Sequence, residues 1–125
     1  MTNDQLALLA KARQSLHATR ILRDEKLFEI SIARAYYTMF YLAQSLLIGK
    51  GLTFSKHGAT HSAFGLHFIK AGQIEPKFHR YLLDSFDLRI TGDYEATATF
   101  NQAQAEEQIT HAEEFLAMTE TLLNT

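Results

Sequence analysis

The chain has 125 residues, of which 46% are hydrophobic and 21% charged. These values suit one folded domain over residues 1–125 and exclude an intrinsically disordered protein. The absence of cysteine excludes disulfide scaffolds, thiol catalysis and cysteine-bound zinc. Because no apolar run reaches about 18 residues and the N-terminus lacks the pattern of a signal peptide, we expect a cytoplasmic protein with no membrane partner.

The net charge of -2 is unevenly distributed along the chain. Residues 1–90 contain all 12 Lys and Arg and half of the 14 acids, whereas residues 91–125 contain the other half and no Lys or Arg. A basic body with an acidic last segment could bind an anion on one face. The acidic segment could equally be an ordinary solvated helix face.

Apolar residues at helical spacing predict five helices, taken here in chain order. The first starts at an Asn3 or Asp4 cap and runs to about Arg23. The second runs from about Lys26 to Ile48, and its apolar stripe includes Ile30, Ala33, Tyr37, Phe40, Ala43 and Leu47. Tyr36 and Tyr41 widen this stripe, so the second helix is expected to be central.

The remaining three helices are predicted from residues that are typical of helix ends. One spans about Gly58 to Lys70, and another begins near Pro76, which suits a first helical turn, and stops at Gly92. Asn101 caps the last helix. No alternating strand pattern or hairpin turn occurs. The predicted fold class is all-α, an antiparallel bundle of about five helices.

Metal and nucleotide motifs are missing from the sequence. His57 and His61 are four residues apart and could share a helix face, but zinc needs a third and usually a fourth ligand. There is no glycine-rich phosphate loop. We therefore expect neither a metal nor another cofactor.

The segment Leu88–Tyr94 is the best candidate for chemistry. Arg89 can clamp a phosphate with two parallel donors. Asp93 could orient Arg89, and the Tyr94 phenol could donate a proton or accept an adenylyl group. A turn at Gly92 would let these side chains converge. An Arg89–Asp93 ion pair that closes a helix end would explain the same residues without catalysis.

Three blocks of the sequence resemble the HEPN-domain family. The first is Ser31–Phe40, with the core Arg-Ala-Tyr-Tyr; the second is Ser55–Gly58 followed by Ala63–Gly72; the third is Arg89 with Asp93 and Tyr94. The resemblance covers about residues 5–122. It is strongest to small bacterial and archaeal HEPN proteins associated with minimal nucleotidyltransferases, and this chain has an Arg-x3-Asp-Tyr variant of their motif.

The resemblance implies a homodimeric toxin-like protein paired with a minimal nucleotidyltransferase as antitoxin. Active HEPN proteins resemble metal-independent endoribonucleases, whose motif is an arginine followed after four to six residues by a histidine. The arginine falls on Arg89. The four-residue spacing from Arg89 reaches Tyr94 and the six-residue spacing reaches Ala96, so the chain departs from the motif at a catalytic position.

Several roles therefore stay open. Catalytic candidates are Arg89, Asp93 and Tyr94; Lys56, His57 and Arg34 are candidate binding residues, and His57 could replace the missing histidine from another helix. Tyr94 is also the candidate for adenylylation by a partner. The chain could cleave RNA at a dimer cleft, bind RNA or a nucleotide without chemistry, or only scaffold a nucleotidyltransferase.

Overall fold

The computed structural model describes residues 1–124 and consists of five α-helices with one short π-helix. Residue 125, the last of the predicted domain, lies outside this description. The helices are α1 (Asn3–Asp24), α2 (Phe28–Ile48), α3 (His57–Phe64), α4 (Pro76–Tyr94) and α5 (Gln102–Leu123), and the π-helix η1 (Gly65–Ile69) continues α3. No strand occurs within residues 1–124. The predicted all-α bundle is confirmed.

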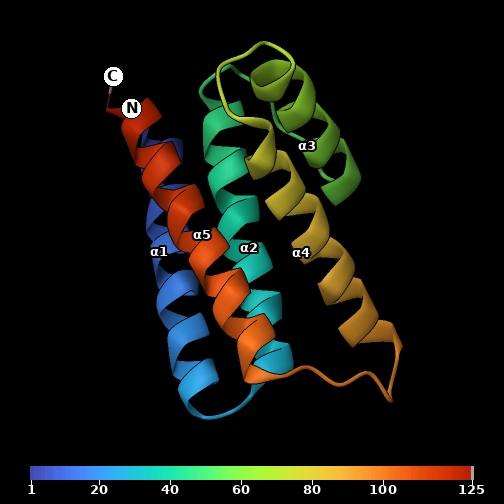
Figure 1. Ribbon diagram of the computed structural model, residues 1–125. Coiled ribbons are helices and arrows are strands. Elements are labelled where there is room, and N and C mark those ends of the chain that lie inside the picture. Colours follow the sequence, from blue (N-terminus) through green and yellow to red (C-terminus); the bar gives the residue numbers. More distant parts are fainter. Residues whose placement is uncertain (125) are drawn as a thin grey trace.

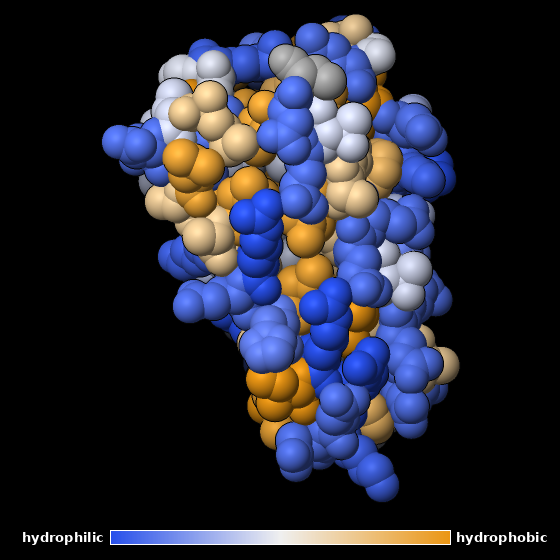
Figure 2. Space-filling view, turned by 90° about the vertical axis from the view of Figure 1, so that its left-hand side faces the viewer, coloured by the Kyte–Doolittle hydropathy of each residue, from blue (hydrophilic) through white to orange (hydrophobic). Residues whose placement is uncertain are grey.

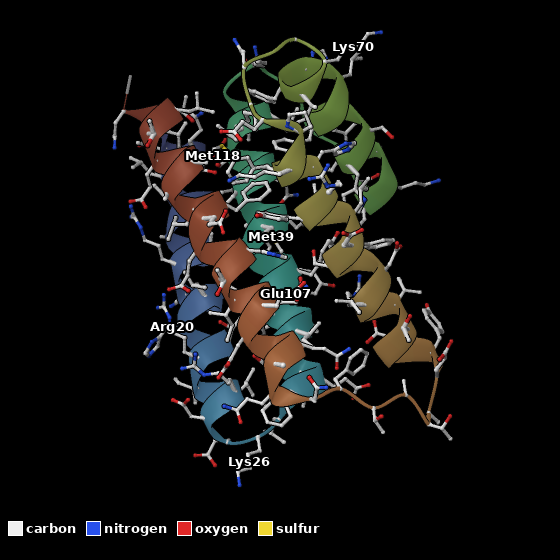
Figure 3. All side chains as sticks on the ribbon, viewed as in Figure 1. Arg20, Lys26, Met39, Lys70, Glu107 and Met118 are labelled. Carbon is white, nitrogen blue, oxygen red and sulfur yellow. The ribbon has the colours of Figure 1, made fainter. Side chains whose placement is uncertain are left out.

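Helix α2 lies at the centre of the bundle, as expected. It packs against α1, α5, α4 and α3, and Figure 1 shows α1, α2 and α5 side by side with α4 along the other side of α2. Met39 points from α2 into the interior, whereas Arg20 and Lys26 point outward (Figure 3). No helix within residues 1–124 is long and apolar enough to cross a membrane.

The buried face of α2 differs from the predicted stripe. The fully buried large residues are Ile32, Tyr36, Met39, Leu42 and Leu47. In contrast, Ile30 is 49% exposed, and Tyr37 and Tyr41 are half-buried. Because α2 is apolar around most of its circumference, periodicity alone did not identify the face that the other helices cover.

Small polar side chains join α1 to α2. The Ser31 hydroxyl donates to the Thr19 carbonyl at 2.8 Å, and the Ser15 hydroxyl donates to the Arg34 carbonyl at 3.0 Å. The Gln5 amide donates to the Ser45 carbonyl at 3.0 Å. Each of these buried or half-buried groups therefore has the partner that burial requires.

The predicted ends of three helices, α1, α3 and α4, were partly wrong. Thr2, not Asn3 or Asp4, caps α1, because its side chain accepts from the Gln5 N–H while the Gln5 side chain accepts from the Thr2 N–H. Helix α3 begins at His57 and passes into η1 at Gly65. Helix α4 continues through Gly92 to Tyr94. The predicted Pro76 start of α4, Gly49 end of α2 and Asn101 cap of α5 are confirmed.

Charges of the acidic last helix are largely paired with basic side chains. Arg13 binds Glu120 at 2.8 Å and Arg20 binds Glu113 at 2.9 Å, both between α1 and α5. Lys77 of α4 lies 3.4 Å from Glu114. On the side where α1 and α5 lie, hydrophilic side chains cover much of the surface, with hydrophobic ones between them (Figure 2). Much of the charge asymmetry of the sequence is therefore matched within the fold.

Candidate functional site

Arg89 lies near the C-terminal end of α4, on the side that faces α2. Its Nε is 3.2 Å from the Asp93 carboxylate, one helical turn further along. The Arg89 side chain is only 22% exposed, whereas that of Asp93 is 47% exposed. The ion pair considered from the sequence therefore forms, and it leaves Arg89 facing the second helix.

The Arg89 guanidinium lies against two aromatic rings of α2. Its Cζ is 5.0 Å from the centre of the Tyr37 ring and 5.8 Å from that of Tyr36. Arg34 Cζ lies 4.4 Å from the centre of the Tyr37 ring. Cation–π attraction stabilises both arginines there, so two guanidinium groups gather around one tyrosine.

The Tyr36 hydroxyl binds both histidines of α3. It lies 2.7 Å from His57 Nδ1 and 2.7 Å from His61 Nε2. A phenol has one proton to donate. When both rings are neutral, the hydroxyl therefore donates to one histidine and accepts from the other. The i, i+4 spacing noted in the sequence does place both rings on one helix face, where they bind a tyrosine.

His57 is held at the start of α3 by stacking. Its ring lies 4.2 Å from that of Phe40 at an angle of 9°. Burial lowers the pKa of His57, and the nearby Arg89 charge lowers it further. With Nδ1 bound to Tyr36, Nε2 forms no hydrogen bond with residues 1–124. The imidazole is therefore neutral near pH 7 and has a nitrogen free to exchange a proton.

The other two members of the network are also kept neutral. Burial raises the pKa of the Tyr36 phenol above its ordinary value. Burial lowers the pKa of His61 to about 4, with further lowering by His57 and His79. His79 of α4 contacts the His61 carbonyl through Nε2 at 3.2 Å. Tyr36, His57 and His61 thus form an uncharged network next to a fixed positive charge.

A hollow of about 270 Å³ lies between the start of α2 and the end of α4, which diverge toward this end of the bundle (Figure 1). Its lining residues are Glu29, Ile30, Ala33, Arg34, Leu88, Arg89, Gly92 and Asp93. A Cβ at Gly92 would lie 3.0 Å from Glu29 Oε1. The expected turn at Gly92 is wrong, because this glycine lies within α4, where the Glu29 side chain of α2 lies close to it.

Two predicted site residues lie apart from this arrangement. Tyr94 is 80% exposed at the last position of α4, and no ring contact, hydrogen bond or ion pair links it to Arg89. Lys56 is exposed and directly precedes α3. The structure thus brings Arg34, His57, Arg89 and Asp93 into one region and leaves Tyr94 and Lys56 at its edges.

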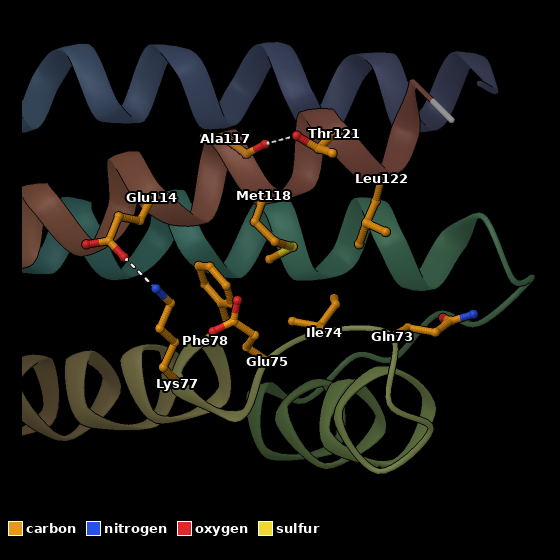
Figure 4. Close-up of a pocket in the computed structure, with 10 residues that line it drawn as sticks. All are labelled: Gln73, Ile74, Glu75, Lys77, Phe78, Glu114, Ala117, Met118, Thr121 and Leu122. Carbon is orange, nitrogen blue, oxygen red and sulfur yellow. Dashed lines mark hydrogen bonds and ion pairs between the residues drawn. The ribbon is translucent and has the colours of Figure 1, made fainter.

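A second hollow, of about 460 Å³, lies at the start of α4 and the end of α5 (Figure 4). Ile74, Phe78 and Met118 line it, and the Lys77–Glu114 ion pair lies at its rim. Two of its three charged lining residues, Lys77 and Glu114, bind each other, and no histidine or arginine of the described chain lines it. Among residues 1–124, no group of three or more His, Asp or Glu side chains is placed to hold a metal ion.

Comparison with known proteins adds to this geometry. The HEPN domain model matches residues 6–122. The chain belongs to the HEPN domain family. A UPF0332 protein of Gloeobacter violaceus is 47% identical over 94 residues, 75% of each chain. A Methanocaldococcus jannaschii protein named "putative toxin" is 38% identical over 110 residues, 88% of this chain and 81% of its own. A UPF0332 protein of Thermotoga maritima is 33% identical over 113 residues, 90% and 86% of the two chains.

The hydrogen bonds of Tyr36 with His57 and His61 in this HEPN chain were not predicted from the sequence. Tyr36 was assigned to core packing, and it is indeed fully buried. Its hydroxyl, however, needs a hydrogen-bond partner when buried. The available signal was the spacing of His57 and His61, four residues apart, which places both rings on one helix face beside a buried phenol.

Proposed function

We propose that this HEPN protein is a toxin-like endoribonuclease that cleaves RNA without a metal, with His57 in place of the histidine that its linear motif lacks. The observation that supports this is the Tyr36 side chain. Its ring contacts the Arg89 guanidinium, and its hydroxyl binds His57. Arginine and imidazole thus meet at one aromatic residue, although 32 positions of sequence separate Arg89 from His57.

The Tyr36 network lets His57 serve as a base or as an acid. When the Tyr36 hydroxyl donates to His61, His57 donates from Nδ1 and its Nε2 can accept a proton. When the hydroxyl donates to His57, His61 donates instead and His57 carries its proton on Nε2. Passing from the first state to the second adds a proton at His57 Nε2, shifts one proton along each hydrogen bond and releases one proton from His61 Nδ1, so the network can relay the proton that His57 takes up.

The reaction begins at a ribose 2′-hydroxyl. His57 Nε2 takes the hydroxyl proton as the 2′-oxygen bonds to the adjacent phosphorus. The bond from phosphorus to the 5′-oxygen then breaks, and this oxygen takes a proton from solvent. The products are a 2′,3′-cyclic phosphate and a 5′-hydroxyl. Arg89 stabilises the charge that develops on the phosphoryl oxygens, and Asp93 holds the guanidinium in place.

The test is a cleavage assay on a mixed RNA pool in EDTA, with analysis of the product ends. We expect wild type to leave 2′,3′-cyclic phosphates. Arg89→Ala and His57→Gln should each reduce the rate by about 10²–10⁴-fold. Arg20→Ala and His17→Gln change the same residue types on α1 and should cleave like wild type. Equal rates for wild type and Arg89→Ala would contradict the proposal. A folded wild type without cleavage would favour the alternative, a non-catalytic RNA- or nucleotide-binding module or scaffold.

The proposed assembly is a homodimer that pairs with a minimal nucleotidyltransferase. Leu27 and Ile30 are 47% and 49% exposed at the start of α2, which suits coverage by a second copy. Light scattering would give the mass of the assembly in solution. A monomer at micromolar concentration would contradict the dimer.

Tyr94 supports a second proposed role, as an acceptor of an adenylyl group from the partner. It is 80% exposed at the end of α4, so its phenol is accessible to another enzyme, unlike the buried Tyr36. Incubation with a minimal nucleotidyltransferase and ATP should add one adenylyl mass to wild type and none to Tyr94→Phe. Addition to both would assign the modification elsewhere.

A further inference from the structure

A line of alternating cations and aromatic rings extends away from Arg89 over α2 and α1. Lys11 Nζ lies 4.8 Å from the centre of the Tyr41 ring. The Tyr41 and Tyr37 rings are 5.9 Å apart. Arg34 and Arg89 then lie over Tyr37. We name Lys11, Tyr41, Tyr37 and Arg34 the cation–aromatic track.

Two hollows follow this track and share Arg34. One is the hollow of about 270 Å³ beside Arg89. The other, of about 310 Å³, lies between α1 and α2 and is lined by Lys11, Gln14, Ser15, Ala18, Arg34 and Tyr41. Arg34 and Tyr41 are seven residues apart on α2, or about 10 Å along the helix. A ligand seated beside Arg89 could therefore continue along the track.

In the described part of the chain, the two cations of the track lack the carboxylate partners that the other Lys and Arg residues of α1 have. Neither Lys11 nor Arg34 forms an ion pair with residues 1–124, whereas Arg13, Arg20 and Arg23 each bind a carboxylate. No acid lines the hollow at Lys11, while Glu29 and Asp93 line the one at Arg89. The end of the track that is remote from Arg89 therefore carries positive charge without a counter-charge.

We propose that the cation–aromatic track binds single-stranded RNA and leads it to Arg89, an inference that rests on the proposed ribonuclease function. Cations that follow a phosphate backbone, alternating with rings that stack on bases, are the usual composition of single-strand binding surfaces. In the free protein Lys11 covers the Tyr41 ring. An arriving phosphate draws the ammonium away and frees the ring for a base. Duplex RNA offers no unstacked base to such rings.

A second copy of the chain suits this surface less well. In a two-fold symmetric dimer that uses this surface, the track of one copy would lie against the track of the other copy. Lys11 and Arg34 of one copy would then face the same cations of the other, and like charges across an interface are unfavourable. RNA, in contrast, supplies the missing negative charge.

The test measures binding apart from cleavage. A short fluorescein-labelled 2′-O-methyl oligonucleotide lacks the attacking hydroxyl, so its anisotropy reports binding alone. In EDTA, Tyr41→Leu should weaken binding about five- to tenfold. Lys11→Ala should lower the slope of log K against log salt by about 0.7. Arg13→Ala removes one charge from the same helix, where it is paired with Glu120, and should bind like wild type.

Other outcomes separate the two proposals. The proposal that the track binds single-stranded RNA is overturned if all three variants bind like wild type. It is also overturned if the protein binds a duplex more tightly than a single strand. If the two track variants instead change the mass in light scattering and not RNA binding, the face is a protein interface and the track is overturned. If wild type binds through the track but leaves ordinary RNA intact, the track stands and the ribonuclease function is overturned. Circular dichroism verifies that Tyr41→Leu is folded.

Discussion

Arginine is used in different ways on two sides of this bundle. Between α1 and α5, Arg13 and Arg20 reach across to carboxylates of the facing helix. Between α2 and α4, Arg34 and Arg89 lie over tyrosine rings. Arg89 also binds a carboxylate, but that of Asp93 on its own helix and not one on a facing helix. A carboxylate neutralises a guanidinium, whereas a ring stabilises it and leaves its charge available.

The difference separates charges that hold helices together from charges that can bind a ligand. Both sides have similar numbers of basic residues, so counting them would not find the site. What distinguishes the α2–α4 side is the environment of Arg34 and Arg89. Tyrosine rings lie against both guanidinium groups, both residues line one hollow, and a neutral histidine network lies next to Arg89. Four changes test whether this contrast is functional.

The largest effect is expected from replacing arginine by lysine on each side. Lysine keeps the charge but lacks the planar fork and stacks less well. Arg89→Lys should therefore reduce RNA cleavage by about 10²–10³-fold, while Arg20→Lys should leave it unchanged. Initial rates on one RNA substrate give both values. If Arg89→Lys retained full activity, charge alone would explain the role of this residue.

Acid should destabilise the protein through the histidine network. The pKa of His61 falls from the ordinary 6.5 to about 4, and that of His57 is also lowered. The unfolded chain therefore binds more protons than the folded chain in this range. Stability is fully present above pH 6.5 and lost as the pH falls toward 4, by about 2–3 kcal/mol for His61.

Urea unfolding at several pH values measures this loss. His61→Gln lacks the titrating ring and should show a flatter dependence between pH 6.5 and 4, while His17→Gln, an exposed histidine of α1, should follow wild type. An identical slope for His61→Gln and wild type would mean that other groups cause the acid sensitivity.

Removing the hydroxyl of Tyr36 should cost about 1–3 kcal/mol of unfolding free energy, because His57 and His61 both lose a partner and His61 is buried. Tyr81→Phe is the matched control. It removes a phenol that donates to Glu114 of α5 at 3.2 Å and should stay within about 0.5 kcal/mol of wild type. Urea unfolding at pH 7.5 compares them. Similar losses in both would argue against a special role of the Tyr36 network.

The smallest effect belongs to the α1–α5 ion pairs. Both partners of the Arg13–Glu120 pair are partly exposed, so Glu120→Gln should cost only about 0.2–1 kcal/mol, and less at high salt. Urea unfolding with and without added salt checks this. A cost that exceeds that of Tyr36→Phe would reverse the contrast between the two sides.

The bundle was largely predictable from the sequence because apolar spacing, Pro76 and Asn101 act locally. The errors at Thr2 and Gly92 also have local causes. Thr2 gains a reciprocal partner in Gln5. Gly92 stays helical because a glycine can adopt helical angles as well as those of a turn, and α4 continues past it to Tyr94.

The site was only half predictable. Arg89 and Asp93 lie on one helix turn, so their pairing could be seen in the chain. The approach of His57 to Arg89 depends on α3 docking against Tyr36 and Phe40 of α2, a contact between distant segments that spacing does not encode. The pairing of α1 with α5 charges was hidden for the same reason.

The docking of α3 has a consequence for control of the protein. His57 is the first residue of this eight-residue helix, and it is held by one hydrogen bond and by stacking. Local opening of α3 would carry away the imidazole while Arg89, Arg34 and the track stayed in place on α2, α4 and α1. Hydrogen exchange at α3 amides would report that opening directly. Under the proposed function, such an opening separates RNA binding from cleavage, with the order of one short helix deciding between the two.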